Sequence, residues 1–424
     1  MWNSSLRIIS IALLVLLCSF LDPGVPNSVS AQEEIIFRNA TVENIYPDGI
    51  VFRVEICGRP QNSRVYFDYK YYWNWEYWWY TDEWTLDEGQ TDDGCDKRKV
   101  LLETKDLYMP PFSPVKFYWS VFSQNKVIAK DIVYIHYYKD DGFDWSSQHN
   151  NGLTVWWHDR PDAFGADILQ IAEKAVEDQS NYYSIELVTP VTIVVFISSD
   201  EFFGWQAEEG YAGGMAFPEI SLTTQLVDES YDYMGWVSDV VPHELSHLFF
   251  HQVMSRQSNK TRWLDEGLAT YNEYNNHLYE WSVIKDGYDK GRLISFAHLQ
   301  STFGDDPYRV DLAYAQSYYA ILYLEEMYGH EKVLSLLEEH GRGSGLESSF
   351  IKAFGLTLDE FEDDYRAWLA TRLNTPPPDT SLPGPPSPAI YFLFAVLLCL
   401  GVFFAFTIGG TIVIVVVANK TWKN

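Results

Sequence analysis

His243-Glu244-Leu245-Ser246-His247 is the stretch of this 424-residue sequence that says most about its fold and chemistry. The two histidines are four residues apart, so in a helix they lie one turn apart on the same face, and both imidazoles can reach one Zn²⁺. Glu244 lies one residue along, close enough to hold the attacking water without binding the metal. We therefore predict that His243 and His247 are zinc ligands and that Glu244 is the general base. An ordinary amphipathic helix that carries the pattern by chance is the alternative.

A third ligand is expected from Trp263-Leu264-Asp265-Glu266-Gly267, where 18 residues separate His247 from Glu266. Catalytic zinc usually takes three protein ligands and a water, and two histidines with a glutamate are a standard set. A second helix that starts near Trp263 and runs antiparallel to the first would bring Glu266 to the same metal. Asp265 is either a partner of a ligand imidazole or a charge in the first helical turn, and the sequence leaves both open.

Residues on either side of the histidine pair limit the type of site. Pro242 precedes the motif and is compatible with a helix there, because proline is tolerated in the first turn of a helix. His251 continues the histidine stripe by one more turn, too far for a compact tetrahedral site, so it is expected to support a ligand or to lie in the core. A metzincin site is excluded, since its glycine and third histidine would fall on Phe250 and Val253.

The histidine pair, the 18-residue spacing and the Trp-Leu-x-Glu-Gly context resemble the gluzincin peptidases, a group that includes thermolysin and the M1 aminopeptidases. The chain also carries Tyr314-Ala315-Gln316-Ser317, which is similar to the Tyr-Glu-Lys-Gly helix of the M1 enzymes. In that family the tyrosine hydroxyl stabilises the oxyanion of the tetrahedral intermediate. The resemblance implies this role for Tyr314, with Tyr318 one turn on as the reserve candidate. A tyrosine that merely packs in the core is the alternative.

The overall layout resembles the M1-related, peptidase MA-like proteins over roughly residues 152–373, and the motifs are specific only near the metal. One departure concerns Gly213-Gly214-Met215-Ala216-Phe217, which stands where M1 aminopeptidases have Gly-x-Met-Glu-Asn. Their glutamate grips the free amine of the substrate, whereas this chain has Ala216. Glu219 is a possible substitute, but it lies far enough along a strand to need a different substrate register. The resemblance therefore implies a peptidase without implying an exopeptidase.

The N-terminal region, residues 32–140, is expected to form an Ig-like β-sandwich. It consists of short runs rich in Val, Ile, Tyr, Phe and Trp between turn signals such as Pro47-Asp48-Gly49. The aromatic segment Tyr69–Trp84 is either a hairpin stabilised by cross-strand pairs or an exposed platform for a glycan, a polypeptide or a membrane surface. Cys57 and Cys95 are expected to form a disulfide, with two buried thiols as the alternative.

Residues 150–373 are expected to form the catalytic domain, because the sequence pattern changes here to a mixture of strands and helices. Strands are predicted near 153–158, 191–197 and 212–223, a helix near 162–182, and helices almost throughout 237–373. Strands followed by helices indicate an α+β fold. The resemblance to gluzincins implies that its sheet and helices are thermolysin-like.

Both ends of the chain carry apolar segments that do not belong to a globular core. Residues 1–31 have the charge, apolar run and small-residue end of a signal peptide. Residues 389–418 contain no charged residue and exceed the roughly 20 needed for a transmembrane helix. A Pro-rich linker, residues 374–388, precedes this segment, and the tail 419–424 contains Lys420 and Lys423, which favour the cytoplasmic side. We expect a single-pass protein of the cell membrane with its catalytic part outside the cytoplasm.

The formal net charge of −29 argues against nucleic acid and anionic lipid as partners, because both would be repelled. Together the motifs predict a membrane-anchored extracytoplasmic zinc metallopeptidase that acts on a peptide or protein, with Zn²⁺ as its cofactor. Two alternatives stay open, namely a catalytically silent binding module and a zinc hydrolase of a non-peptide acyl substrate.

Asn39 and Asn259 match the glycosylation acceptor pattern.

Overall fold

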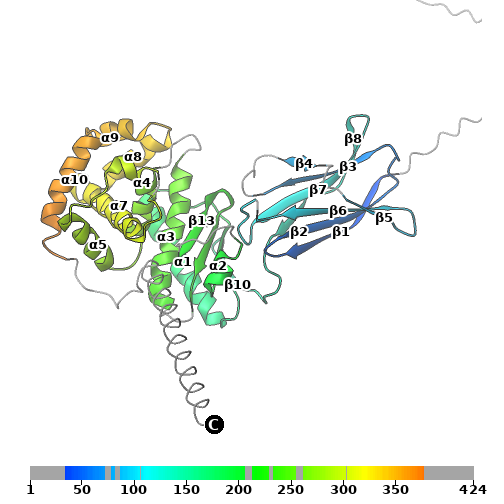
Figure 1. The fold of residues 1–424 in the computed structure, drawn as a ribbon, viewed down its shortest axis with the longest axis horizontal. Coiled ribbons are helices and arrows are strands. Elements are labelled where there is room, and N and C mark those ends of the chain that lie inside the picture. Colours follow the sequence, from blue (N-terminus) through cyan, green and yellow to red (C-terminus); the bar gives the residue numbers. More distant parts are fainter. Residues whose placement is uncertain are drawn as a thin grey trace, which may run out of the picture.

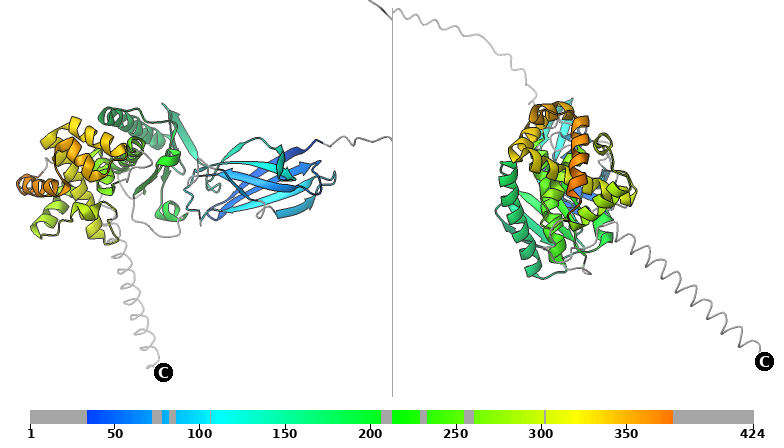
Figure 2. Two further views of the ribbon diagram at one scale, coloured as in Figure 1. Left: turned by 90° about the horizontal axis from the view of Figure 1, so that it is seen from above. Right: turned by 90° about the vertical axis from the view of Figure 1, so that its left-hand side faces the viewer.

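The computed structural model describes residues 34–71, 78–81, 86–105, 107–205, 213–228, 233–254, 261–301 and 303–376. Three parts follow one another in space: a β-sandwich, a mixed sheet with helices, and a helical part (Figures 1 and 2). The expected α+β class is confirmed. The predicted signal peptide, transmembrane segment, cytoplasmic tail and Asn259 lie outside the described residues. Within the described ranges, no helix has the length and apolar character needed to cross a membrane.

The N-terminal part consists of two antiparallel sheets that face each other. One sheet has the strand order β1-β2-β6-β5 and the other β4-β3-β7-β8, with β9 also paired to β7. Aromatic rings fill the space between them, since the centroid of Phe52 lies 4.7 Å from that of Phe67 and 4.6 Å from that of Phe117. The strands are β1 (Ile36–Ile45), β2 (Gly49–Cys57), β3 (Arg64–Lys70), β4 (Trp79–Thr81), β5 (Leu86–Gln90), β6 (Asp96–Glu103), β7 (Pro114–Ser123), β8 (Lys126–Lys130) and β9 (Tyr134–Tyr137).

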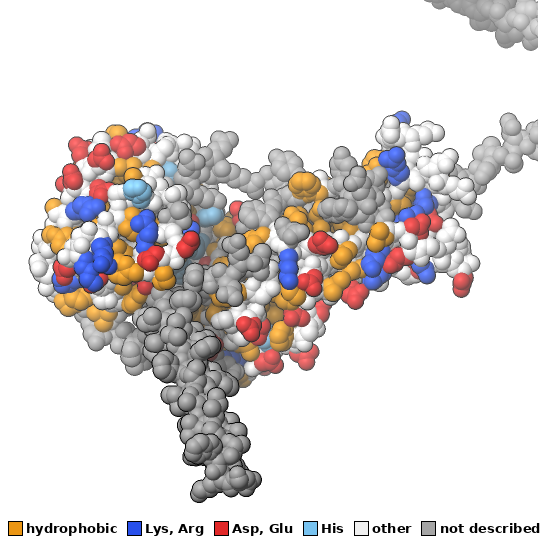
Figure 3. All heavy atoms as spheres, viewed as in Figure 1, with side chains coloured by type: hydrophobic (Ala, Val, Ile, Leu, Met, Phe, Trp, Pro, Cys, Tyr) orange, Lys and Arg blue, Asp and Glu red, His pale blue; other side chains and the backbone are white. Residues whose placement is uncertain are grey.

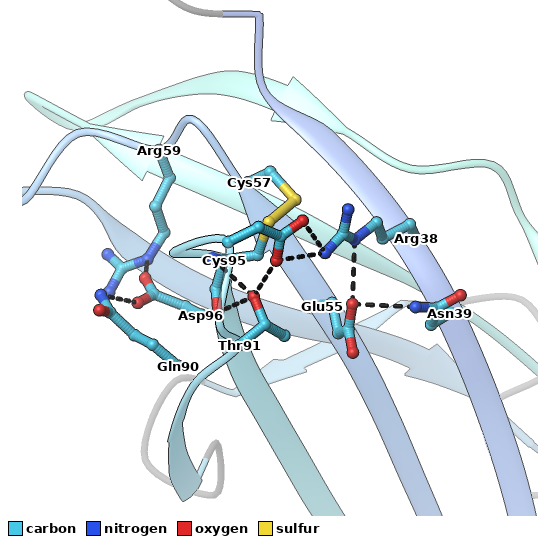
Figure 4. Close-up of a disulfide and its surroundings, with 10 residues drawn as sticks. Arg38, Asn39, Glu55, Cys57, Arg59, Gln90, Thr91, Cys95 and Asp96 are labelled. Carbon is cyan, nitrogen blue, oxygen red and sulfur yellow. Dashed lines mark hydrogen bonds and ion pairs between the residues drawn. A yellow bond between two sulfur atoms is a disulfide. The ribbon is translucent and has the colours of Figure 1, made fainter.

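The predicted disulfide between Cys57 and Cys95 is confirmed. It joins the end of β2 to the residue before β6, and these two strands already pair through Ile56 and Asp96. Polar contacts surround it, including an ion pair between Arg59 and Asp96 (Figure 4). The crosslink therefore fastens one end of the two central strands of a single sheet.

The start of the aromatic segment Tyr69–Trp84 forms a hairpin, which was one of the two interpretations of this segment. β3 and β4 pair antiparallel, with Tyr69 opposite Trp79. Trp78 and Trp79 are 36% and 56% exposed, and Trp78 packs edge-on against Tyr118 at 4.7 Å. Residues 72–77 and 82–85 of the segment lie outside the described residues, so its use as a binding platform stays a prediction.

A five-stranded mixed sheet forms the middle of the molecule, in the order β10-β11-β12-β14-β13. β11, β12 and β14 are parallel, and the two outer strands run antiparallel to their neighbours. Its strands are β10 (Ser146–Asn150), β11 (Leu153–Trp157), β12 (Val191–Phe196), β13 (Gly214–Phe217) and β14 (Leu222–Leu226), and its helices are α1 (Asp162–Tyr183), α2 (Ser199–Phe203) and α3 (Tyr233–Val253).

The single strand expected over 212–223 is wrong, because two strands occupy this region. Pro218 has no backbone N–H to donate to a sheet, and the chain turns there through the short 3₁₀ helix η2 (Pro218–Ile220). Ser221 follows in the left-handed region with φ 50°, which reverses the chain into β14. As a result β13 is an edge strand of the sheet.

The two faces of the middle sheet pack against different partners. Along β12, Ile193 and Val195 join the core formed with α1 and α3. The alternate residues Val194 and Phe196 join the core of the β-sandwich instead. Residues of the sandwich reach across, as when Phe112 packs against Trp156 with a centroid distance of 5.3 Å. The sandwich and the sheet therefore share a continuous apolar core.

Helices make up the rest of the described chain and enclose one large apolar cluster. Close packing of α4 on α7 depends on Gly267, where an added Cβ would lie 2.6 Å from the carbonyl oxygen of Ser317. These helices are α4 (Arg262–Tyr271), α5 (Leu278–Asp289), α6 (Phe296–Leu299), α7 (Pro307–Tyr328), α8 (His330–Gly341), α9 (Leu346–Phe354) and α10 (Leu358–Arg372).

Pro242 does not lie in the first turn of the helix that carries the histidine motif, where a proline would be tolerated. It lies in the interior of α3, which starts at Tyr233. A proline there removes the hydrogen bond to the carbonyl four residues earlier. That carbonyl belongs to Ser238, and it accepts a hydrogen bond from the backbone N–H of Tyr274 at 3.3 Å instead. A tertiary contact thus satisfies the group that the proline leaves free.

Candidate metal and active site

Three side chains from α3 and α4 converge on one point. The Nε2 atoms of His243 and His247 each lie 3.5 Å from Oε2 of Glu266. Two ligands bound to one tetrahedral Zn²⁺ at about 2.0–2.2 Å lie roughly 3.4 Å apart, so this spacing fits a shared metal. Oε2 of Glu266 is buried and, within the described part of the chain, has no hydrogen-bond partner. The residues present therefore fit a zinc ion.

Both histidines are oriented by carboxylates behind them. Nδ1 of His243 donates to Glu273 at 2.8 Å, and Nδ1 of His247 donates to Asp265 at 2.6 Å. A carboxylate can only accept, so these contacts place the proton on Nδ1 and leave Nε2 free to bind a metal. His251 also reaches Asp265, at 3.3 Å. Of the two interpretations of Asp265, the structure therefore agrees with a partner of a ligand imidazole. His251 contacts the same carboxylate and supports it.

In this cluster, burial and nearby charges shift the pKa values of the side chains in opposite directions. Burial lowers the pKa of His247, but Asp265 overrides this effect and raises it to about 9. Burial raises the pKa of Asp265, yet the charge of His247 holds that pKa well below its usual range. Carboxylate and imidazolium thus stabilise each other's charge inside a site that excludes most solvent, and a bound metal would displace the proton on Nε2.

Glu244 lies between the histidines and the edge strand β13. Its side chain is buried, and burial raises its pKa to about 7, although the charges of His243 and His247 lower it. A pKa near neutrality suits a group that takes and returns a proton. The strand approaches so closely that a Cβ on Gly214 would lie 2.5 Å from Oε1 of Glu244. Glycine at this position is what lets β13 lie directly against Glu244.

Tyr314 on α7 reaches the same cluster. The centroid of its ring lies 6.2 Å from that of His243, and the charges of Glu266 and Glu244 act on its hydroxyl. Burial raises the pKa of Tyr314 well above its usual value, so the hydroxyl keeps its proton and can donate a hydrogen bond. Tyr318, the reserve candidate, instead stacks on His277 with a centroid distance of 4.1 Å. Of the two tyrosines, the structure brings Tyr314 to the site.

Two residues of the site were missed by the sequence analysis. Nη2 of Arg262 lies 3.3 Å from Oε1 of Glu266, which leaves Oε2 turned toward the histidines, and its guanidinium also donates to Tyr314. Its position one turn before Glu266 on the same helix was a usable signal. Glu273 gave no such signal, because it lies beyond the end of α4 and reaches His243 only through the tertiary fold.

The position that holds the amine-binding glutamate in M1 enzymes lies on β13. Ala216 pairs with Thr223 of β14 and packs against the core beneath the sheet. Glu219 does not continue that strand, because the chain leaves it at Phe217 and Glu219 is exposed in the 3₁₀ helix. The idea that Glu219 lies further along the same strand is therefore wrong.

Comparison with known proteins agrees with this arrangement. Residues 171–371, which include every predicted site residue, match the family model of the Peptidase MA superfamily. This part of the chain is therefore similar to the Peptidase MA superfamily. The predicted resemblance to gluzincin-like peptidases is thereby confirmed.

Two known proteins to which the chain is similar are aminopeptidases by name. The alanine/arginine aminopeptidase of Saccharomyces cerevisiae is 25% identical over 202 residues, which is 47% of this chain and 22% of that protein. The match thus spans about a fifth of that relative. A solved aminopeptidase N family protein from Idiomarina loihiensis is similar at 11% identity and a TM-score of 0.39, over 75% of this chain and 58% of that one.

Proposed function

We propose that this protein is a zinc-dependent peptidase whose metal is held by His243, His247 and Glu266. The observation that carries the proposal is the convergence of two Nε2 atoms, both free to bind a metal, on the unpartnered Oε2 of Glu266 at 3.5 Å. Zn²⁺ in this position would lower the pKa of a water and polarise a scissile carbonyl. The match of residues 171–371 to the Peptidase MA superfamily supports peptide bonds as the target.

The chain's own side chains supply the proton transfers. Glu244 takes a proton from the attacking water and passes it to the leaving amine, a role that its burial and near-neutral pKa support. The hydroxyl of Tyr314 donates a hydrogen bond to the oxyanion that develops on the scissile carbonyl, which is worth about 2.7–4 kcal/mol in comparable sites. Arg262 keeps Tyr314 and Glu266 in place through one guanidinium.

The proposed enzyme does not depend on a free substrate N-terminus. Ala216 offers no charge at the position where the M1 enzymes grip an amine, and the exposed Glu219 has left the strand. Substrate would lie along the edge strand β13, next to Glu244. We therefore propose cleavage within a polypeptide rather than removal of its first residue.

We also propose that this peptidase works outside the cytoplasm on a membrane anchor. The proposal is supported by the signal-peptide pattern of residues 1–31 and the uncharged segment 389–418 followed by Lys420 and Lys423. The disulfide between Cys57 and Cys95 suits an oxidising compartment.

The test is cleavage of a mixed peptide library whose members have acetylated N-termini. We expect hydrolysis by the purified protein, its loss with a zinc chelator and its return when Zn²⁺ is added back. Glu331→Gln, which changes an exposed carboxylate on α8, is the control and should behave like the parent. Turnover of unblocked peptides alone would contradict the endopeptidase mode. An absence of chelator-sensitive cleavage would contradict the peptidase and favour a binding module, and turnover of acyl esters alone would favour a different zinc hydrolase.

A further inference from the structure

A second group of metal-binding side chains lies between α4 and α5. Glu273 and His277 precede α5, and Glu280 lies in its first turn. One possible ligand atom from each residue lies within 4.8 Å of the other two. The three side chains are largely enclosed, with exposed fractions of 13%, 11% and 14% in chain order.

Two atoms in this group are buried without a partner. Nδ1 of His277 and Oε2 of Glu280 are shut off from solvent and make no hydrogen bond to any described residue. Such orphaned polar atoms destabilise the fold unless something satisfies them. They lie 3.7 Å apart, too far for a hydrogen bond, which would need about 2.9 Å. The distance is close to the 3.5 Å between the ligand atoms of the first site.

Two further carboxyl groups lie near this group. Burial raises the pKa of Asp239 to about 8, and the charges of Glu273 and Glu280 add to this effect. Burial also raises the pKa of Asp311, and the charge of Glu280 adds to it. The charges of Glu273 and Glu280 are therefore felt by their neighbours, and a cation bound between these two carboxylates would be attracted strongly because little solvent screens it.

The three side chains are held in place from several sides. The ring of His277 stacks on Tyr318 with an interplanar angle of 24°, and its backbone N–H donates to the side chain of Asn275 at 2.6 Å. The amide of Asn275 donates in turn to Oε2 of Glu273 at 2.8 Å. The other oxygen of Glu273 accepts from His243 of the first site. A carboxylate has about four acceptor positions, so Glu273 can keep both bonds and bind a metal.

We propose that Glu273, His277 and Glu280 bind a second divalent cation of the Zn²⁺ type, linked to the first site through Glu273. One imidazole nitrogen with two carboxylate oxygens favours zinc and similar transition metals, whereas calcium prefers six to eight oxygen ligands. A cation beside Glu273 withdraws electron density from the carboxylate that orients His243, so occupancy of this site tunes the first one. Cation binding here does not depend on the peptidase proposal.

The test is a zinc titration of the metal-free full chain, followed by metal analysis of the protein after gel filtration. We expect two zinc ions per chain in the parent and one in His277→Gln and in Glu280→Gln. Glu280→Gln keeps the size and shape of the side chain, so it decides the matter if the histidine variant does not fold. Glu338→Gln, an exposed carboxylate on α8, is the matched control and should still bind two.

One zinc per chain in the parent would overturn the inference and leave His277 and Glu280 as an ordinary ion pair. Two zinc ions in Glu280→Gln would also overturn it, since the second ion would then lie elsewhere. Calcium that displaces the second zinc at equal concentration would overturn the choice of metal. Two zinc ions without any peptide hydrolysis would support the inference while the peptidase proposal fails.

Discussion

The two clusters of His and Glu side chains have nearly the same ligand spacing but differ in how their histidines are held. In the first, Glu273 and Asp265 accept from Nδ1 of His243 and His247, so Nε2 faces the metal position. In the second, His277 stacks on Tyr318, and its Nδ1 has no hydrogen-bond partner among the described residues. Carboxylates behind metal-binding histidines raise affinity. We therefore expect the first cluster to bind zinc more tightly than the second.

The largest expected difference between the two clusters comes from removing one ligand from each. Glu266→Ala should abolish zinc binding at the first cluster together with peptide hydrolysis, because it removes a ligand and leaves two imidazoles without the third. Glu280→Gln should remove only the weaker zinc, and hydrolysis should fall by no more than the roughly 10- to 100-fold typical of outer partners. Zinc analysis and kinetics on the same preparations would check this. Equal losses of hydrolysis in both variants would erase the distinction.

The next effect concerns the two tyrosines of α7. Tyr314→Phe should lower kcat about 10²- to 10³-fold at unchanged zinc content, since it removes a donor to the oxyanion. Tyr318→Phe keeps the ring that stacks on His277 and should lower kcat far less. Steady-state kinetics on both variants provide the measurement. A larger loss with Tyr318→Phe would move the catalytic role to the second cluster.

A smaller effect is expected from the carboxylates behind the histidines. Asp265→Asn should weaken zinc binding at the first cluster about 10- to 100-fold and leave the second cluster unchanged. Glu273→Gln should weaken both, because Glu273 contacts His243 and belongs to the second cluster. Calorimetric titration resolves the two affinities. If Glu273→Gln affected only one of them, Glu273 would not link the clusters.

The smallest effect is expected from His251. Its bond to Asp265 is long at 3.3 Å, and a hydrogen bond to a charged group contributes about 1.5–3 kcal/mol at most. His251→Gln should therefore weaken the first zinc site less than Asp265→Asn does, and it should leave the second unchanged. The same titration compares them. A loss of zinc equal to that in Glu266→Ala would make His251 a ligand.

Sequence reasoning reached the parts of the site that follow from helix periodicity. His243 and His247 lie on one face of α3 because they are four residues apart, and Glu266 was located by its spacing from them. The α+β class and the Cys57–Cys95 disulfide also followed from local patterns and from the cysteine count. These features depend on short stretches of chain.

Features that depend on contacts between distant segments were not predictable. Pro242 could be placed inside α3 only because Tyr274 satisfies the carbonyl of Ser238, which no local pattern reveals. Glu273 and His277 come together with α3 and α7 through packing of the loop after α4. β13 and β14 were merged into one strand because the turn at Pro218 is short, although the proline itself was a signal.

The most direct test of the zinc peptidase is Glu244→Gln, measured for zinc content and peptide hydrolysis in one preparation. Glu244 is buried against Gly214 and is not a metal ligand in this account, so glutamine should fit the same space. We expect Glu244→Gln to bind as many zinc ions per chain as the parent, with peptide hydrolysis reduced to background. Hydrolysis at the parental rate with zinc retained would contradict it.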